Sequence, residues 1–386
     1  MKEFIKKILG GFISICTPID KKLIAFESEG DMTDNSYALY EYMLENHFAD
    51  RYYFVWFVED IHHQKKFIHT KYVGKIGKIN IIKKMYYLSR CKYYIYDHCN
   101  YFDGLRVKKK KNQMIVNLWH GCGVKSGVLA KEESSVDMLL ATSEAFYDAL
   151  SRILGVKREK IYNLGYPRTD YFYKSLNAAQ MKCRERFAEF DKVILWMPTF
   201  RRSYNPELDE VYFQSATGMP ILINEEELEQ FNQFLHNRNA LCVLKVHHLQ
   251  VALPSFKNAF SNIWIVKDEE LKMLGMQLYQ MVVLSDCLIT DYSSIATDYM
   301  LLDRPIIYTL DDYEQYNKSR GFIFYDCIQY FAGEKVYDKK ELYKAIDNII
   351  VGKDTYAQER KQINDLFNEY QDGEHCKRIL EKIGIK

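Results

Sequence analysis

The sequence predicts an α/β protein with two domains, each built on a parallel, helix-covered β-sheet, that face each other across a central cleft. Three observations lead to this fold class. The chain has 386 residues, which is too long for one ordinary hydrophobic core and suits two domains. Hydrophobic residues make up 48% and charged residues 27%, as in folded globular proteins. Short apolar runs alternate with helix-like segments throughout, which is typical of parallel sheets with crossover helices.

The apolar runs are predicted to be buried strands. They cover 52–58, 93–97, 114–119 and 138–142 in the first half of the chain, and 193–199, 240–247, 263–266, 287–290 and 305–309 in the second. The break between the two sets lies near 175–190. We therefore expect a first domain at 26–180 and a second at 181–386, whose last helix is a candidate to cross back to the first. The sequence contains no internal repeat.

The N-terminal segment 1–25 is predicted to contain an amphipathic, membrane-associating helix. Phe4, Ile8 and Phe12 recur with helical spacing, while lysines occupy other positions. No apolar run reaches the roughly 18 residues needed to cross a bilayer. A signal peptide is not indicated, because charges and two glycines interrupt the apolar stretch. Two interpretations remain open: a helix lying on the membrane surface, or a first helix packed on the body of the protein.

Charge and cysteine content exclude several classes of protein. Lys and Arg number 53 against 52 Asp and Glu, so the chain has no overall attraction for nucleic acid. The nine cysteines are scattered without a C-x-x-C pair, which indicates reduced thiols in the cytosol and neither a disulfide framework nor a zinc site. Nothing in the sequence requires another metal, because no carboxylate cluster resembles a divalent-cation site.

Two basic segments of the first half could attract an anionic surface. Residues 83–97 combine lysines with tyrosines, and residues 108–111 are four consecutive lysines. They could hold an anionic membrane or a polyanionic acceptor. The alternative for each segment alone is a Tyr-rich strand with a solvated lysine turn.

The most unusual histidine follows a predicted strand directly. In "NLWHGCGVKSG", His120 precedes Gly121, Gly123 and Gly127. Glycines let a loop approach a ligand closely, so main-chain N–H groups and Lys125 could reach a phosphate. His120 could accept the proton of an attacking hydroxyl. The alternative is a structural histidine that caps a glycine turn. The spacing is not that of a Walker loop.

Two further strand ends carry polar side chains suited to phosphate. His247 in "LKVHHLQ" could donate a hydrogen bond to a phosphoryl oxygen. Its neighbour His248 would point the other way from a strand. Thr199 and Arg201, in "PTFRRS", follow another strand, and arginine suits bidentate contacts with phosphate.

The segment "DCLITDYSSIATDYMLLDRPIIY" is predicted to fold as strand, turn, helix and strand. Ser293 and Ser294 lie at the expected helix start, where hydroxyl and free N–H groups can bind an anion. Serine there also has the plain explanation of an N-cap. Asp291 precedes them, and we expect its carboxylate to organise the turn through backbone amides, since a bare negative charge would repel phosphate.

Taken together in their order, these motifs resemble the CDP-glycerol glycerophosphotransferases of teichoic acid synthesis. The resemblance runs from about residue 90 to the end of the chain and also includes "LGYPRTDYF", "DDYEQYNKSRGFIFYD" and "DGEHCKRIL". It implies a GT-B-like fold of two Rossmann-like domains, an acceptor domain first and a CDP-glycerol-binding domain second. It also implies peripheral attachment to the cytoplasmic face of the bacterial membrane.

The resemblance further implies roles for single residues. His120 matches the histidine taken as the general base, and His247 matches a second essential histidine thought to bind the donor's phosphates. Arg201 matches the T-F-R position, and Ser293 and Ser294 match the T-D-Y-S-S phosphate site. Two departures concern loop shape and acceptor choice: "GCG" replaces the commoner "GTP" after "WH", and a histidine replaces the proline that usually follows the second histidine.

The expected reaction is an in-line attack by an acceptor hydroxyl on the β-phosphorus of CDP-glycerol, with release of CMP. His120 would take the proton, and His247, Arg201, Ser293 and Ser294 would hold the pyrophosphate. The acceptor would be a lipid-linked glycan or a polyol-phosphate polymer of teichoic acid or capsule. No cofactor is expected.

Several alternatives stay open from sequence alone. The chain length favours a primase-type enzyme, since family polymerases commonly carry a long additional region. A polymerase, or a transferase that uses CDP-ribitol, remains a competing assignment within the family. Outside the family, the alternatives are a nucleotide-sugar glycosyltransferase of the same architecture and an inactive protein that binds membrane or polymer. The oligomeric state is not predicted.

Overall fold

The computed structural model describes residues 2–62, 64, 66–75, 77–127, 133–199, 215–246, 250–251 and 253–386. The chain forms two compact units. The first contains Met1–Gly121, Val128–Tyr173 and Glu369–Lys386, and the second contains Cys122–Gly127 and Lys174–Asn368. The division at 173/174 lies earlier than the expected 180/181. The last segment, which contains the C-terminal helix, belongs to the first unit.

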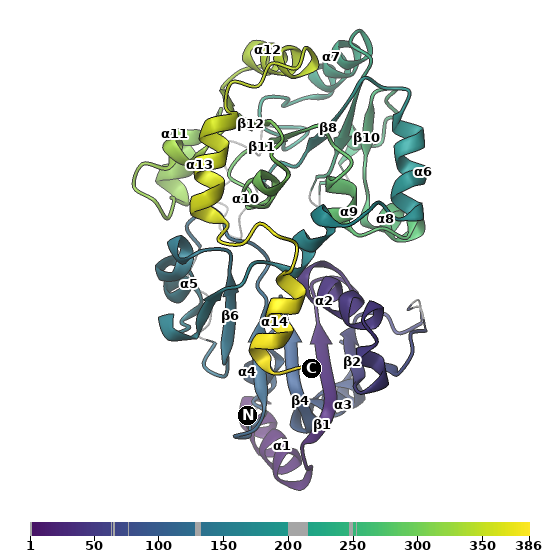
Figure 1. The fold of residues 1–386 in the computed structure, drawn as a ribbon, viewed down its shortest axis with the longest axis vertical. Helices are drawn as coiled ribbons and strands as arrows, with labels where there is room; N and C mark the ends of the chain where they lie inside the picture. The colour runs from purple at the N-terminus through teal and green to yellow at the C-terminus, as the bar shows by residue number, and fades with distance from the viewer. Residues whose placement is uncertain are drawn as a thin grey trace. The chain divides into compact units, whose positions relative to one another are not determined.

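The first unit is built on a seven-stranded sheet of order β3-β2-β1-β4-β5-β6-β7 (Figure 1). Neighbouring strands of this sheet pair in parallel throughout the described part of the chain. Its strands are β1 Asp20–Glu27, β2 Tyr53–Val58, β3 Thr70–Gly74, β4 Cys91–Tyr96, β5 Met114–Asn117, β6 Met138–Ala141 and β7 Ile161–Asn163. Its helices are α1 Lys2–Cys16, α2 Asp34–Glu45, η1 Phe48–Asp50, α3 Lys78–Arg90, α4 Tyr101–Leu105, η2 Glu144–Phe146, α5 Tyr147–Leu154, η3 Arg158–Lys160, η4 Pro167–Tyr173 and α14 His375–Ile383.

The second unit repeats this plan with a six-stranded parallel sheet of order β10-β9-β8-β11-β12-β13. Its strands are β8 Lys192–Trp196, β9 Ala240–Leu244, β10 Ile263–Ile265, β11 Cys287–Thr290, β12 Ile306–Thr309 and β13 Glu334–Val336. Its helices are α6 Ala178–Phe187, α7 Glu225–His236, η7 Pro254–Phe256, α8 Asp268–Leu274, α9 Leu278–Val282, α10 Ile295–Tyr299, η8 Met300–Leu302, α11 Tyr313–Ser319, η9 Cys327–Tyr330, α12 Lys339–Ile350 and α13 Ala357–Phe367.

Local chemistry explains where these elements begin and why they pack. The central strands are apolar along their length and are buried, as expected for sheets with helices on both faces; Trp56 of β2 and Trp196 of β8 are fully buried. Helices begin at capping residues: the side chains of Asn224 and Asp338 accept the amide of the third helical residue in α7 and α12.

The sequence-based expectations differ from the structure in several places. The strands expected at 193–199 and 240–247 end at Trp196 and Leu244. Segment 1–25 is not all helix, because α1 ends at Cys16 and the central strand β1 begins at Asp20. The strand expected at 114–119 ends at Asn117, because Trp119 has a left-handed backbone with φ 56°. Strands β1, β3, β7 and β13 were not predicted.

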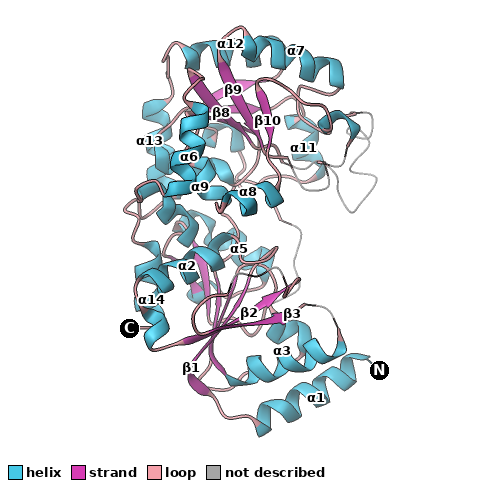
Figure 2. Cartoon of the chain, turned by 90° about the vertical axis from the view of Figure 1, so that its right-hand side faces the viewer, coloured by secondary structure: helices cyan, strands magenta, loops and turns pink. Residues whose placement is uncertain are grey.

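Helix α1 packs on the body of the first unit. It lies beside α3 (Figure 2). Gly10 and Ser14 face the first unit and are buried, and the Ser14 hydroxyl donates to the Lys108 carbonyl at 2.7 Å. Its apolar residues Ile8 and Phe12 are exposed. The helix is therefore packed on the body through its small residues and leaves an apolar face uncovered.

Candidate functional site

The sheet order places the two candidate sites at equivalent positions in the two units. In each sheet the strand order reverses once, between β1 and β4 in the first and between β8 and β11 in the second. Ligands of open α/β sheets bind beyond the carboxyl ends of the strands at such switch points. Asp97 follows β4 and His120 follows the neighbouring β5, whereas Thr199 follows β8 and Asp291 follows β11.

His120 has a defined tautomer. Its Nδ1 lies 3.2 Å from the main-chain carbonyl oxygen of Asp97. A carbonyl oxygen only accepts hydrogen bonds, so Nδ1 carries the proton and donates it to this oxygen. In the neutral ring, Nε2 is then left as the proton acceptor. The structural alternative, a histidine that only caps a glycine turn, does not require this orientation.

The surroundings of His120 favour its neutral form. The side chain is exposed at its surface, yet desolvation by the dense protein around it lowers the pKa of the imidazole below its ordinary value of 6.5. The hydrogen bond to Asp97 and the carboxylates of Asp34 and Glu29 oppose this shift, and Arg168 adds to it. A lowered pKa keeps the imidazole unprotonated at neutral pH, which is the state that a general base needs.

The loop after β5 enters the second unit directly after Gly121. Residues 122–127 lie against residues 321–323: Lys125 forms an antiparallel bridge with Phe322, the Ser126 N–H donates to the Gly321 carbonyl at 3.0 Å and the Ile323 N–H donates to Val124 at 2.9 Å. Gly123 passes over the start of α10, because a Cβ at this position would lie 2.9 Å from the Cα of Ser294. Only glycine permits this approach without a shift of the loop.

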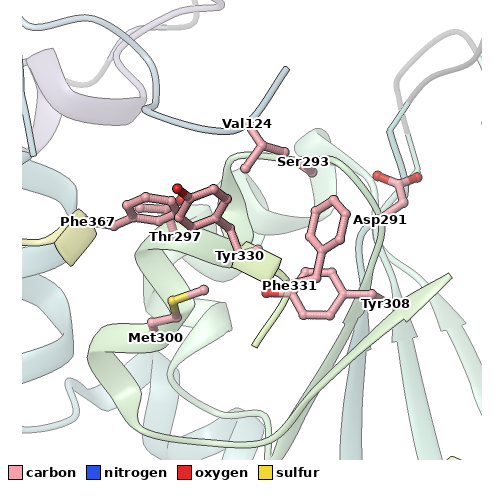
Figure 3. Close-up of a pocket in the computed structure, with 10 residues that line it drawn as sticks. Val124, Asp291, Ser293, Thr297, Met300, Tyr308, Tyr330, Phe331 and Phe367 are labelled. Carbon is pink, nitrogen blue, oxygen red and sulfur yellow. The ribbon is translucent and has the colours of Figure 1, made fainter. Parts of the chain in front are cut away.

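Ser294 occupies the N-cap position of α10, but its side chain makes no capping hydrogen bond. Its backbone (φ −62°, ψ −16°) is already helical, unlike the extended backbone of an ordinary N-cap. The side chain of Ser294 therefore does not act as an N-cap, which is the role that would most simply explain a serine at this position. Ser293 is half-buried and lines a small pocket with room for about one water molecule. Figure 3 shows that Val124, from the loop after β5, and Asp291 line the same pocket.

Asp291 organises the backbone at the switch point of the second unit. Its fully buried carboxylate accepts the Thr199 N–H at 2.8 Å and the Thr199 hydroxyl at 2.6 Å. The expectation that Asp291 bonds a backbone amide holds, although the amide comes from the neighbouring strand end and not from its own turn. These bonds fix the chain where it leaves β8, immediately before the segment that contains Arg201.

The structure thus groups the predicted residues in two sets. His120 and Gly121 belong to the first unit, and Lys125, Thr199, Asp291, Ser293 and Ser294 belong to the second. Arg201 and His247 lie outside the described residues. Within the described ranges, no group of three or more His, Cys, Asp or Glu side chains is arranged to hold a metal ion, and no helix has the length and apolarity needed to cross a membrane.

The closing motif "DGEHCKRIL" has a structural role in the first unit. His375 is buried, with its Nδ1 2.7 Å from the Asp170 carboxylate and its Nε2 3.2 Å from the Tyr370 carbonyl. The two Asp170 oxygens also accept the backbone N–H groups of His375 and Cys376. This motif and "PRTD" therefore fasten α14 to the first unit.

Comparisons with known proteins match nearly the whole chain. A family model described as CDP-glycerol:poly(glycerophosphate) glycerophosphotransferase matches residues 11–384. The teichoic acid ribitol-phosphate primase of Bacillus spizizenii is 24% identical, over 99% of this chain and 98% of that protein. A teichoic acid poly(glycerol phosphate) polymerase of the same organism is 24% identical, over 95% and 93%.

Solved structures show the same fold. The wall teichoic acid polymerase TagF, in a variant form, superposes with a TM-score of 0.77 at 20% identity, covering 99% of this chain and 95% of that one. One polymerase relative is matched over 93% of its length, whereas three other polymerase relatives are matched over 44%, 62% and 53% of theirs and are longer than this chain. Polymerases of both lengths therefore occur among the relatives, and chain length alone does not separate a primase from a polymerase.

Proposed function

Because the chain belongs to the CDP-glycerol:poly(glycerophosphate) glycerophosphotransferase family, we propose that it transfers glycerol phosphate from CDP-glycerol to an acceptor hydroxyl and releases CMP. The acceptor is a lipid-linked glycan or a teichoic acid or capsule polymer, and the first addition to such a glycan, the primase reaction, is the activity we favour. The acceptor oxygen forms a bond with the β-phosphorus, the bond from that phosphorus to the oxygen of CMP breaks, and the acceptor proton passes to His120 Nε2.

The observation that carries this proposal is the hydrogen bond from His120 Nδ1 to the Asp97 carbonyl. It leaves Nε2 as the hydrogen-bond acceptor of the ring, and the lowered pKa keeps that nitrogen unprotonated. After transfer, the imidazolium can still donate from Nδ1 to the carbonyl, which stabilises the charged form as it appears.

The second unit supplies the proposed donor site. Ser293 and Ser294 present hydroxyl groups at the start of α10, and the loop 122–127 brings its backbone to the same place. The backbone N–H groups of this loop, with Lys125, are assigned to the pyrophosphate, together with that of Gly121, the last residue of the first unit before the loop. Thr199 and Asp291 shape the adjoining strand ends. The sequence-based roles of Arg201 and His247 on the donor phosphates are part of the same proposal.

Chain connectivity supports joint action of these groups. Three peptide links separate His120 from Gly123, so their Cα atoms stay within about 11 Å of each other in any conformation. Gly123 in turn contacts Ser294. We infer a GT-B-like arrangement in which the first unit holds the acceptor and the second the nucleotide. Transfer would then depend on positioning and electrostatics, as phosphoryl transfer generally does.

We also propose that α1 and α3 bind the cytoplasmic membrane surface, where a lipid-linked acceptor resides. The exposed apolar side chains on these adjacent helices are Ile8, Phe12 and Ile15 of α1 and Ile79, Ile82 and Tyr86 of α3. Helix α3 has no acidic residue, and Lys78 and Lys83 are exposed on it. Apolar insertion flanked by lysines suits anionic lipids.

Vesicle sedimentation tests this membrane proposal. The protein should sediment with phosphatidylglycerol vesicles and not with phosphatidylcholine vesicles, and Phe12→Glu should release it. The matched control is Val351→Glu, an exposed apolar residue of the second unit, which should leave sedimentation unchanged. An equal loss of vesicle binding in both variants, or vesicle binding that Phe12→Glu does not reduce, would contradict the assignment.

CMP release tests the reaction itself. Purified protein is given CDP-glycerol or CDP-ribitol with a lipid-linked disaccharide, and CMP is quantified for wild type, His120→Ala and the control His236→Ala, an exposed histidine at the end of α7. Acceptor-dependent CMP that His120→Ala abolishes and His236→Ala retains supports the proposal. Release of a nucleoside diphosphate from a UDP or GDP sugar would favour a glycosyltransferase. The absence of turnover with any donor would favour an inactive binding protein.

CDP-ribitol is the second donor candidate because the ribitol-phosphate primase relative aligns over almost the full length of both chains. The same assay separates the two donors by the ratio of their kcat/KM values. Product length, measured with the preferred donor in excess, separates a primase, which adds one unit, from a polymerase.

A further inference from the structure

A buried asparagine joins three segments of the chain next to His120. Asn35, at the start of α2, is fully buried. Its Nδ2 donates to the Trp119 carbonyl at 2.8 Å, and its Oδ1 accepts the Arg168 N–H at 3.1 Å. A carbonyl only accepts and an N–H only donates, so the amide has one orientation that satisfies both bonds. The side chain therefore ties the loop after β5 to the first turns of α2 and η4.

The residue that Asn35 holds needs this support. Trp119 has φ 56°, the left-handed region that is unfavourable for residues with a side chain, and such backbones cost roughly 1–3 kcal/mol. Two hydrogen bonds fix it: its N–H donates to Asn117 Oδ1 at 2.8 Å, and its carbonyl accepts from Asn35. The turn at Trp119 sets the direction of His120, and the two rings lie 3.9 Å apart between centroids.

We propose that Asn35 is a positioning residue for His120: by holding the Trp119 carbonyl it keeps the imidazole on the Asp97 carbonyl and thereby keeps Nε2 directed at the acceptor hydroxyl. The role in turnover rests on the proposed function, whereas the role in orienting the ring does not. Asn35 touches neither reacting atom. Its effect is therefore expected in kcat and in the state of the His120 ring.

The kinetic test is a double-mutant cycle. Asn35→Ala should lower kcat about 10–100-fold, the cost of misplacing a reacting group by about 1 Å, and should change KM for CDP-glycerol less than about threefold. In a His120→Ala background the same substitution should have almost no further effect on residual CMP release. Asn35→Asp, which keeps the shape and the bond from Arg168 but cannot donate to Trp119, should behave like Asn35→Ala.

Gln113 provides the matched control. It is also a buried amide of the first unit with two donated bonds, to Leu88 and Cys91 at 2.7 and 2.8 Å, but it lies before β5, at the opposite end of the strand. Gln113→Ala should lower stability without changing kcat of the folded enzyme. Equal kcat losses for the two alanine variants, or losses by Asn35→Ala that are the same with and without His120, would overturn the positioning role.

A measurement independent of catalysis completes the test. ¹⁵N NMR of the histidine rings, with the His120 signals assigned by their absence in His120→Ala, reports which ring nitrogen carries the proton. Wild type should show a single Nδ1–H tautomer for His120, and Asn35→Asp should show a mixture. A single tautomer that persists in Asn35→Asp overturns the proposal even if the enzyme is inactive with every donor. If the wild-type protein is inactive with every donor but Asn35→Asp still changes the His120 tautomer, the proposed function is refuted and the positioning role is retained.

Discussion

Replacing Gly123 by alanine tests the contact between the loop after β5 and the start of α10. The new Cβ would lie 2.9 Å from Ser294 Cα and 3.0 Å from its Cβ. Ordinary contacts of this kind begin at 3.4 Å, so the loop or the helix start must move by about 0.5 Å. The backbone of Gly123 does not have a positive φ, so the alanine side chain causes no strain apart from this contact.

The displacement is large enough to affect transfer. Functional groups must be held within about 0.5 Å of their productive positions, and a misplacement of 1 Å costs about 100-fold. We therefore expect Gly123→Ala to lower kcat/KM for CDP-glycerol about tenfold, equivalent to about 1.4 kcal/mol of transition-state stabilisation. The assay is CMP release over a range of CDP-glycerol concentrations, with the thermal unfolding midpoint measured on the same sample.

The control is Gly104→Ala, in α4 of the first unit, where an added Cβ meets nothing within 4 Å. Its activity should equal that of wild type. A kcat/KM for Gly123→Ala within twofold of wild type, in a folded protein, would refute the reasoning, because it would show that the approach of Gly123 to Ser294 has no part in the reaction.

Three further predictions concern the first unit. The acid limb of kcat/KM against pH should lie below the ordinary histidine pKa of about 6.5, since desolvation by the surrounding protein lowers the pKa of His120, and His120→Ala should remove this limb. Asp34→Asn should move the limb to still lower pH, because the Asp34 carboxylate raises this pKa and Arg168 lowers it; a move to higher pH would contradict the electrostatics. Gly165→Ala should destabilise the protein in urea by roughly 2–5 kcal/mol through left-handed strain and overpacking, because φ is 75° and the new Cβ would lie 2.1 Å from the His375 ring; a loss below about 1 kcal/mol would contradict it.

The strands that the sequence predicts are those with continuous apolar runs, and the missed ones lack such runs for a physical reason. Strands β3, β7 and β13 lie at sheet edges, where one side of the strand faces no neighbour and polar residues are tolerated. "TKYVG" and "EKV" show this composition. Strand β1 is central but begins with "DKK", whose residues are not buried. Its apolar part, Leu23–Phe26, is only four residues long. It also follows an amphipathic helix, whose periodicity is the stronger signal in this part of the sequence.

The candidate site was predictable where its residues follow strands, and unpredictable where partners are far apart in the chain. His120, Ser294 and Asp291 all come directly after apolar runs, and their type suggests their chemistry. Asn35 is separated by 84 residues from Trp119 and by 133 from Arg168. No local pattern links such residues, because the β-sheet order alone brings their loops together. "PRTD" could be recognised as a motif, but its bond to Asn35 required the structure.

One loop serves both parts of the proposed reaction, and this makes their contributions separable by kinetics. His120 belongs to the first unit, and Gly123, three residues later, belongs to the second. Gly123→Ala alters the loop where it contacts the proposed phosphate site, so donor binding and turnover should change together. Asn35→Ala alters the same loop on the other side of His120 and should change turnover alone. If both variants raised KM for CDP-glycerol equally, the loop would act as one body, and the assignment of proton transfer and phosphate binding to its two ends would be wrong.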